Sequence, residues 1–299
     1  MRILLLGSNG QVGWELQRAR SPLGIVMAYD RHQANLEDLL SLKQILLDVS
    51  PDLIINAAAY TAVDQAESES DKAYLINAKA VGVIAETAKK LNVRFVHYST
   101  DYVFDGTKVG SYVEEDSTAP LNVYGKSKLE GEKAIIGSGC DHFIFRTSWV
   151  YGQHGKNFIK SILRLAQTKD VLKVVNDQYG APTSAELIAD VTAHMLKNTF
   201  NGVENEQKEN GIYHLTSSGR TNWFEFARYI IDQAQHFGST FKLTSNKVTP
   251  IASEEFPLPA QRQKNSSLNV DKLSKKIELM MPDWRFHVSR TISQLTNLN

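Results

Sequence analysis

The amino terminus of the chain holds the pattern that most constrains its fold. Residues 2–6 form a short apolar run, residues 7–13 follow the spacing Gly-x-x-Gly-x-x-Gly, and apolar side chains then recur at helical spacing. A strand, a glycine-rich turn and a helix in this order are typical of dinucleotide-binding proteins, because glycines let the backbone approach a pyrophosphate at the positive end of the helix. The commoner spacing is Gly-x-Gly-x-x-Gly, and a glycine-rich turn can also be only a turn. Residues further along the chain therefore have to support this interpretation.

Apolar strand-like runs alternate with amphipathic helical patterns up to about residue 150. We expect strands over residues 2–6, 25–29, 53–55, 94–98 and 142–146, and helices over residues 38–49, 73–91 and 124–136. This alternation predicts an α/β fold of the Rossmann type, with a doubly wound parallel sheet. The predicted dinucleotide-binding domain spans residues 1–150 and is completed by parts of 170–200 and 220–240. Residues 151–299 largely form a smaller mixed α/β substrate domain, with helices at 158–166, 185–196 and 223–235, strands at 172–175 and 212–215, and a polar connector at 198–210.

A threonine and a tyrosine–lysine pair form the candidate catalytic group. Thr100 follows the apolar run 94–98, at the carboxyl end of a predicted strand, where open α/β sheets bind their ligands. Tyr124 and Lys128 lie four residues apart in a helical pattern and therefore share one helix face. An ammonium beside a phenol lowers its pKa, and such a tyrosine can protonate a carbonyl oxygen that Thr100 also hydrogen-bonds. The alternative is a solvated helix face, because one Tyr-x-x-x-Lys is expected by chance in a chain with eleven tyrosines.

Residues at the other predicted strand ends leave pairs of alternatives open. Asp30 suits the ribose hydroxyls of a dinucleotide, whereas Arg31 can face a 2′-phosphate. The small residues of 56–61 either allow a cofactor to lie against the backbone or form a simple turn. Trp149 belongs either to the core or to a site where it stacks on a ring, and the irregular stretch 104–122 is expected to form a loop over the site.

Composition narrows the function classes. The 33 Lys and Arg residues balance 33 Asp and Glu residues without a basic block, so a nucleic-acid or membrane-surface role has no support. The opening apolar run ends at Gly7, too early for a signal peptide or a membrane span. The single cysteine, Cys140, cannot form an internal disulfide and is expected to be a buried thiol. The sequence predicts a cytoplasmic protein.

Several longer segments together resemble one family. They read Gly-x-x-Gly-Gln-Val-Gly at 7–13, Asn-Ala-Ala-Ala-Tyr-Thr-Ala-Val-Asp at 56–64, Ser-Thr-Asp-Tyr-Val-Phe-Asp-Gly at 99–106, Asn-Val-Tyr-Gly-Lys-Ser-Lys at 122–128, Phe-Arg-Thr-Ser-Trp-Val-Tyr at 145–151 and Asn-Asp-Gln-Tyr-Gly-Ala-Pro-Thr at 176–183. The combination, which runs over nearly the whole chain, resembles the dTDP-4-dehydrorhamnose reductases, a family of extended short-chain dehydrogenases/reductases.

The resemblance implies the last step of dTDP-L-rhamnose synthesis, the reduction by NADPH or NADH of the 4-keto group of dTDP-6-deoxy-L-lyxo-4-hexulose. It makes Tyr124 the proton donor, Lys128 its partner and a ligand of the cofactor ribose, and Thr100 the hydroxyl that tunes the pKa. Expected cofactor contacts, besides Tyr124 and Lys128, are Gly7, Gly10, Gln11, Val12, Gly13, Asp30, Arg31, Asn35, Leu36, Ala59, Tyr60, Thr61 and Tyr98. Expected substrate contacts are Thr100, Asp101, Trp149, Asn157 and Arg262.

The resemblance also implies a possible homodimer with Mg²⁺ at its interface, and Glu15 and Glu186 match the acids of that metal site. Two residues depart from the family pattern: Asn35 stands where an Asp often lies near the adenine, and Gln263 stands where a proline is expected after Arg262. The second departure puts the rigidity of that substrate-side loop in doubt.

Other functions remain to be weighed against the reductase. A sugar-nucleotide dehydratase needs an acid/base pair after the strand-end threonine, and Tyr102 follows Asp101 here, so half of that pair is missing. A non-catalytic regulatory subunit, of the kind associated with methionine adenosyltransferase, and another sugar-nucleotide reductase or epimerase of the same family are the remaining alternatives.

Overall fold

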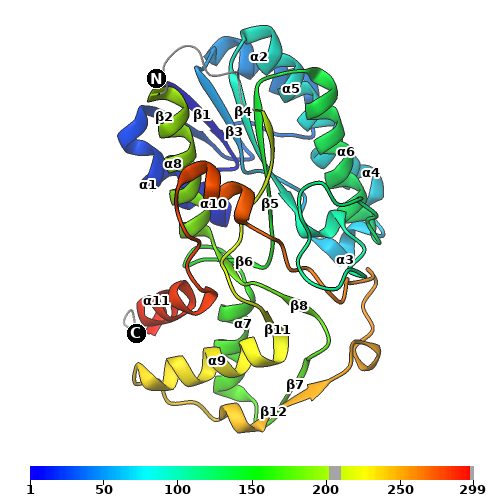
Figure 1. Cartoon of the computed structure of the whole chain (residues 1–299), viewed down its shortest axis with the longest axis vertical. Helices are drawn as coiled ribbons and strands as arrows, with labels where there is room; N and C mark the ends of the chain where they lie inside the picture. The colour runs from blue at the N-terminus through cyan, green and yellow to red at the C-terminus, as the bar shows by residue number, and fades with distance from the viewer. Residues whose placement is uncertain (202–209, 297–299) are drawn as a thin grey trace.

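A parallel sheet forms the larger part of the molecule. The computed structural model describes residues 1–201 and 210–296. The six-stranded sheet has the order β10-β5-β4-β3-β1-β2, and every neighbouring pair is parallel (Figure 1). Its strands are β1 (Arg2–Leu6), β2 (Ile25–Tyr29), β3 (Leu53–Asn56), β4 (Arg94–Thr100), β5 (His142–Thr147) and β10 (Gly211–His214). Every residue of β3, β4 and β5 is buried, which explains why these strands read as largely apolar runs without a polar residue at every second position.

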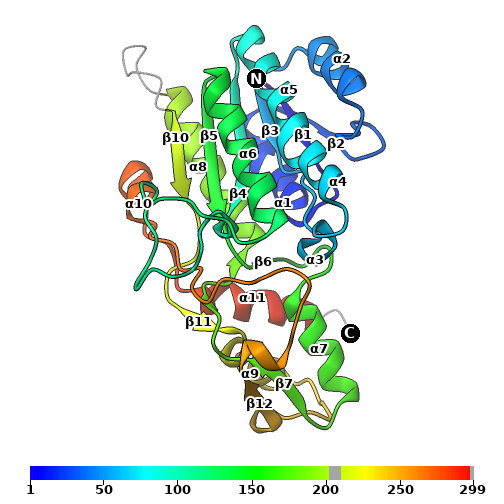
Figure 2. The same ribbon diagram turned by 90° about the vertical axis from the view of Figure 1, so that its right-hand side faces the viewer.

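Helices cover both faces of this sheet. One face packs against α1 (Gln11–Arg20), α8 (Ala185–Asn201) and α10 (Asp271–Ile277), and the other packs against α2 (Leu39–Val49), α5 (Ala80–Leu91) and α6 (Val123–Ser138). Figures 1 and 2 show the two helical layers with the sheet between them. The predicted doubly wound parallel sheet of the Rossmann type is therefore confirmed.

A smaller part of mixed structure lies beyond the carboxyl ends of the strands (Figure 2). Its core combines α7 (Phe158–Thr168), α9 (Trp223–His236) and α11 (Trp284–Thr296) with the parallel pair of β7 (Leu172–Val175) and β12 (Val248–Ile251). α9 packs on α7 and α11, so it lies apart from the sheet that parts of 220–240 were expected to complete. The strand expected at 212–215 in this smaller part is β10, which instead joins the large sheet beside β5, so that placement was wrong. The division of the chain at residue 150 otherwise stays a prediction.

Short elements connect the two parts. Two-residue strands form the pairs β6 (Val150–Tyr151) with β9 (Thr183–Ser184) and β8 (Tyr179–Gly180) with β11 (Thr221–Asn222). The remaining short helices are α3 (Val63–Ala66), α4 (Ser70–Tyr74), η1 (Ser21–Leu23), η2 (Leu75–Lys79), η3 (Asp101–Val103), η4 (Ser245–Lys247) and η5 (Ser253–Glu255).

Three further expectations about individual segments of the sequence need correction. The helix expected over 73–91 is divided, because α4 passes into the π-helix η2 before α5 begins. The connector expected at 198–210 lies mostly outside the described residues, and α8 extends through Asn201. The loop 104–122 contributes nothing to the described lining of the candidate site, because it packs instead on the segment after β12 through Tyr112, whose N–H donates to the carbonyl of Ser267 (2.8 Å).

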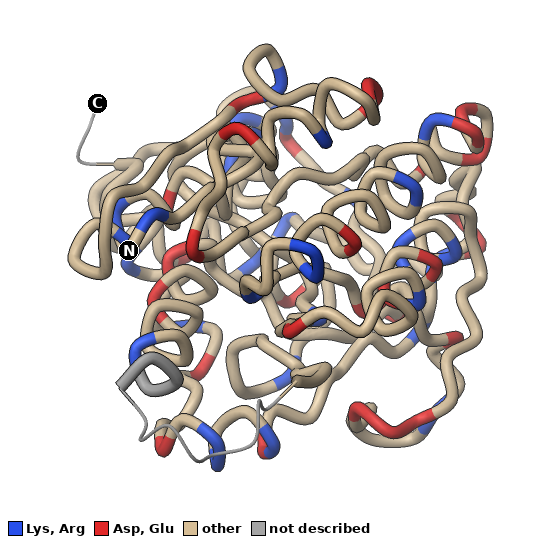
Figure 3. The backbone as a smooth tube through the Cα atoms, turned by 90° about the horizontal axis from the view of Figure 1, so that it is seen from above, with Lys and Arg blue, Asp and Glu red and all other residues tan. Residues whose placement is uncertain are grey.

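Charge and hydropathy agree with the composition. Basic and acidic residues are interspersed over the described chain (Figure 3). Within residues 1–201 and 210–296, none of the helices combines the length and the apolar character that a membrane span requires. Cys140 is a buried free thiol, as predicted.

Candidate active site

The carboxyl ends of the strands open into a cavity of about 970 Å³. Parallel strands end at one edge of a sheet, so a single cavity collects residues from segments far apart in the chain. It is lined by most of the residues that the sequence assigns to a cofactor or substrate: Gly7, Gly10, Gln11, Val12, Asp30, Arg31, Asn35, Leu36, Ala59, Tyr60, Thr61, Tyr98, Thr100, Asp101, Tyr124, Lys128 and Trp149.

The glycine-rich turn places the start of α1 at this cavity. Gly10 is the residue before the helix, no side chain caps it, and Gln11 and Val12 follow it into the cavity wall. Gly13 lies outside the wall, and a Cβ atom there would come within 2.0 Å of the Gly7 carbonyl oxygen. Only glycine therefore allows the helix to approach the turn so closely. The free N–H groups at the positive end of α1 fit a pyrophosphate.

The residues after β2 present both charges to the cavity. The carboxylate of Asp30 accepts hydrogen bonds from Asn9 Nδ2 (3.0 Å) and from the backbone N–H groups of His32 (2.8 Å) and Gln33. Arg31 is mostly exposed and forms an ion pair with Glu37. The carboxylate of Asp30 is thus held in place by the turn. The guanidinium of Arg31 is paired with Glu37, and binding a phosphate would require it to leave that carboxylate.

Tyr124 and Thr100 meet where β4 ends. α6 begins after Asn122, whose side-chain oxygen accepts from the N–H of Gly125 (2.9 Å). A Cβ atom at Gly125 would lie 2.2 Å from the carbonyl oxygen of Tyr102, so glycine permits the first turn of α6 to lie against η3. Burial of its hydroxyl raises the pKa of Tyr124, and a hydrogen bond with Thr100 opposes this increase. Tyr124 therefore keeps its proton at neutral pH.

Lys128 is turned toward the central strand. Its Nζ donates to the carbonyl oxygen of Tyr98 (2.6 Å) and lies 3.1 Å from Nε2 of His97. Burial lowers the pKa of Lys128 to about 8, although Glu132 raises it in part. The sequence predicted that this lysine lowers the pKa of Tyr124. That decrease is wrong for the structure, because burial dominates at the tyrosine and the lysine makes its polar contacts with β4.

Asp101 connects the catalytic group to the carboxyl-terminal segment. The hydroxyl of Thr100 donates to its Oδ1 (2.8 Å), and Gln263 Nε2 donates to its Oδ2 (3.1 Å). Burial raises the pKa of Asp101 to about 7, while hydrogen bonds from Thr100 and Ser266 lower it. Gln263, which replaces the expected proline, is itself buried. A side-chain hydrogen bond thus connects this loop to the site.

Trp149 packs beside the core of the smaller part and also lines the cavity, and stacking on a bound ring stays a prediction. The ring stacks on Trp223 with the centroids 3.6 Å apart, beside the core of the smaller part, and it also lines the cavity. Its backbone is left-handed (φ 49°), a conformation that is rare for a residue with a Cβ atom. The strained turn brings an aromatic face to the carboxyl end of β5.

Two predicted substrate residues lie outside the cavity lining. The oxygen of Asn157 accepts from the N–H of Lys160 and caps α7, and its Nδ2 donates to Gln11 Oε1 (3.0 Å). Arg262 donates to Asp64 Oδ2 (2.8 Å) and lies 5.9 Å from the ring of Tyr102, beside the cavity. Their roles toward the substrate stay predictions.

Sequence reasoning did not find two polar residues behind the catalytic group. Asn56 ends β3 and His97 lies inside β4, and both are about 1% exposed. For His97 the sequence did hold a signal, because it is a titratable side chain in the middle of a largely apolar run. Burial of such a side chain is costly unless it has a hydrogen-bonding partner.

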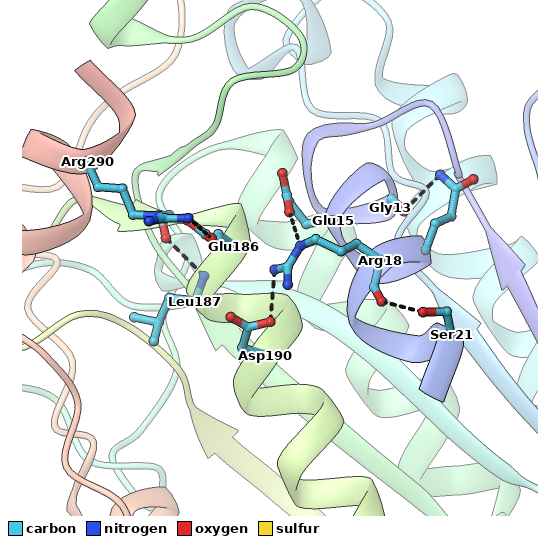
Figure 4. A network of polar contacts seen from close by, with 10 residues as sticks. Gly13, Glu15, Arg18, Ser21, Glu186, Leu187, Asp190 and Arg290 are labelled. Atoms are coloured by element: carbon cyan, nitrogen blue, oxygen red, sulfur yellow. Dashed lines mark hydrogen bonds and ion pairs between the residues drawn. The ribbon is translucent and has the colours of Figure 1, made fainter. Parts of the chain in front are cut away.

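The two acids expected to bind Mg²⁺ are held by arginines instead. Arg290 donates to both carboxylate oxygens of Glu186 (3.1 and 3.2 Å), and Arg18 donates to Glu15 (3.1 Å) and to Asp190 (2.9 Å), as Figure 4 shows. No group of three or more His, Cys, Asp or Glu side chains within the described ranges is arranged to hold a metal ion. Guanidinium groups pair with these carboxylates within the single chain, and the Mg²⁺ site that the resemblance implies at a dimer interface stays a prediction.

Comparison with known proteins decides the family. Residues 1–297 match the family model described as RmlD substrate binding domain. The dTDP-4-dehydrorhamnose reductase of Escherichia coli K12 is 45% identical over 299 residues, covering 99% of this chain and 98% of that protein, and the enzyme of Burkholderia thailandensis is 44% identical over 99% of both. This chain belongs to the dTDP-4-dehydrorhamnose reductase family. The resemblance seen in the sequence is therefore confirmed.

Solved structures of the reductase family have the same fold. A dTDP-4-dehydrorhamnose reductase from Clostridium acetobutylicum superposes with a TM-score of 0.89 at 35% identity and covers 99% of both chains. A reductase from Bacillus anthracis, solved in complex with NADP, gives a TM-score of 0.87 at 34% identity and covers 98% of this chain and 99% of that one. A dTDP-glucose 4,6-dehydratase from Streptomyces venezuelae is 18% identical with a TM-score of 0.77, a likeness of fold alone.

Proposed function

We propose that this chain reduces the 4-keto group of dTDP-6-deoxy-L-lyxo-4-hexulose to give dTDP-L-rhamnose. The observation that carries the proposal is the meeting of Thr100, Tyr124 and Lys128 at one cavity that also holds the start of α1. The names of the relatives, which match nearly the whole chain, support the substrate and the reaction.

The raised pKa of Tyr124 keeps the proposed proton donor in its protonated form. A group whose pKa lies above its usual value near 10 is fully protonated at pH 7, so the hydroxyl is ready to protonate the carbonyl oxygen of the sugar. Thr100 forms a hydrogen bond with Tyr124, and it stabilises the phenolate that forms when its hydroxyl proton turns from Asp101 to the phenolate oxygen. The charged form of Lys128 adds a second stabilising group on the same helix face.

A nicotinamide cofactor supplies the hydride when bound. We propose that the first turn of α1 holds its pyrophosphate, that Asp30 holds the adenosine ribose and that Lys128 holds the second ribose. The NADP complex of the Bacillus anthracis relative supports NADPH. The carboxylate of Asp30 supports NADH as well, because ribose hydroxyls can donate to it.

Turnover by the purified chain tests this proposal. We expect NADPH oxidation that depends on the 4-keto sugar nucleotide and yields dTDP-L-rhamnose, identified by mass spectrometry and NMR. Tyr124→Phe is the matched control, because it removes only one hydroxyl. Cofactor binding without turnover would overturn the proposal in favour of the regulatory-subunit alternative. The homodimer and the cytoplasmic location stay predictions, and light scattering tests the first.

A further inference from the structure

A buried polar chain runs from the backbone after β3 to the catalytic lysine. The N–H of Ala58 donates to Asn56 Oδ1 (3.0 Å), Asn56 Nδ2 lies 3.3 Å from Nδ1 of His97, and Nε2 of His97 lies 3.1 Å from Nζ of Lys128. The three linked side chains are each about 1% exposed. The mechanism above uses only the last of them.

The donors and acceptors along this chain fix the tautomer of His97. A backbone N–H is always a donor, so the Asn56 atom that faces Ala58 is the oxygen. The amide nitrogen of Asn56, which is also only a donor, then faces Nδ1 of His97. Nδ1 therefore accepts and carries no proton. Burial and the nearby lysine lower the pKa of His97 well below its usual value, so the ring is neutral and its one N–H is at Nε2.

The Nε2–H group of His97 points at the nitrogen of Lys128. An ammonium has three N–H donors and no lone pair, so it would place one donor against another at 3.1 Å. A neutral amine has a lone pair that accepts this N–H, and it still donates to the carbonyl of Tyr98 (2.6 Å). We infer that Asn56 and His97 are positioning residues that favour the uncharged form of Lys128 and so set the pH range in which the reductase works.

The charged groups around Lys128 do not cancel the preference for its uncharged form. Glu132, one turn further along α6, raises the pKa of Lys128, but Arg146 donates to both of its carboxylate oxygens (2.9 and 2.7 Å). From the cavity side, Tyr124 of α6 and Asp101 of η3 line the same space. Burial lowers the pKa of Lys128 to about 8. The charged form, which stabilises a phenolate, is therefore lost as the pH rises through the alkaline range of the assay.

A variant that reverses the tautomer of His97 tests the inference. The expected change in the pH profile of kcat rests on the proposed function. In Asn56→Asp, a carboxylate oxygen replaces the amide nitrogen and accepts a hydrogen bond from an Nδ1–H group, so Nε2 carries no proton and becomes an acceptor for the ammonium. We expect the alkaline limb of the kcat profile to move up by about one pH unit or more. Asn77→Asp is the control, because Asn77 is equally buried and bonds to Ser127 and Tyr60 rather than to His97. Equal displacement by both variants would mean that added charge alone acts, which would overturn the inference.

NMR of the histidine ring nitrogens gives a readout that does not depend on turnover. We expect His97 of the wild-type chain to carry its proton at Nε2 at neutral pH, and to carry it at Nδ1 in Asn56→Asp. A wild-type His97 protonated at Nδ1, or at both nitrogens, would overturn the inference. Absence of turnover would instead contradict the proposed function, so the two failures are distinguishable.

Discussion

We expect the choice between NADPH and NADH to depend in part on one ion pair that lines the cavity. Arg31 is 68% exposed and paired with Glu37, which Lys72 also approaches (3.7 Å). An exposed pair of this kind contributes about 0–1 kcal/mol, whereas a hydrogen bond from a guanidinium to a phosphate contributes about 1.5–3 kcal/mol. Exchanging Glu37 for the 2′-phosphate therefore gains about 1–2 kcal/mol net, or roughly 5–30-fold in kcat/KM at 1.4 kcal/mol per tenfold.

We therefore expect Arg31→Ala to lower kcat/KM for NADPH by about 5–30-fold and for NADH by less than about twofold. Glu37→Gln frees the guanidinium and should raise kcat/KM for NADPH by up to about fivefold. Initial rates at saturating sugar nucleotide, with each cofactor varied in turn, measure both effects.

Asp30 contributes the opposing preference, because its carboxylate accepts from ribose hydroxyls and repels a 2′-phosphate. Asp30→Ala should lower kcat/KM for NADH more than for NADPH, and the wild-type values should lie within about a hundredfold of each other. A melting curve accompanies this variant, since Asp30 also holds the turn after β2. An equal effect of Arg31→Ala on the two cofactors would refute the reasoning.

Five further changes have defined outcomes. Tyr124→Phe should lower kcat by about 10²–10⁴-fold and leave cofactor binding nearly intact, whereas Lys128→Met should weaken cofactor binding as well as lower kcat. Near wild-type turnover by the Tyr124→Phe variant would exclude Tyr124 as the general acid. Trp149→Ala should raise the sugar-nucleotide KM more than the cofactor KM and also lower Tm, and an unchanged KM would assign the ring to the core alone. Gln263→Leu removes the hydrogen-bond donor to Asp101 and should raise the pKa of Asp101 above about 7. The acidic limb of the kcat/KM profile should then move up by about one pH unit, and an unchanged profile would contradict this expectation. Chelation of divalent cations should leave activity and Tm unchanged, since arginines hold both candidate acids; a loss reversed by Mg²⁺ would show that a cation displaces them.

The elements that the sequence predicts well are those whose signal is local. β4 is a largely apolar run, as burial on both faces requires, and the order of strand, turn and helix at the amino terminus needs no distant partner. The start expected for the helix over 124–136 is one residue from that of α6, and its cap is local, because the side chain of Asn122 accepts from the N–H of Gly125.

Long-range pairings account for the errors. The segment 104–122 reads as an exposed loop, but the backbone of Tyr112 exchanges hydrogen bonds with Ser267 and Asn269, which lie far along the chain. The π-helix η2 has the same apolar pattern as an α-helix, because only the register of its hydrogen bonds differs. No local pattern specifies either feature.

The catalytic pair shows most clearly what spacing alone leaves open. The spacing of four residues agrees with the position of Tyr124 and Lys128 at one cavity, but it does not indicate how far the two side chains are buried from solvent. Burial raises the pKa of the phenol and lowers that of the amine, so both shifts favour the uncharged pair. Proton donation creates a phenolate, the form that burial penalises. The reaction therefore depends on Thr100 and on the charged form of Lys128 to offset that penalty, and residues that control the lysine's charge control the rate.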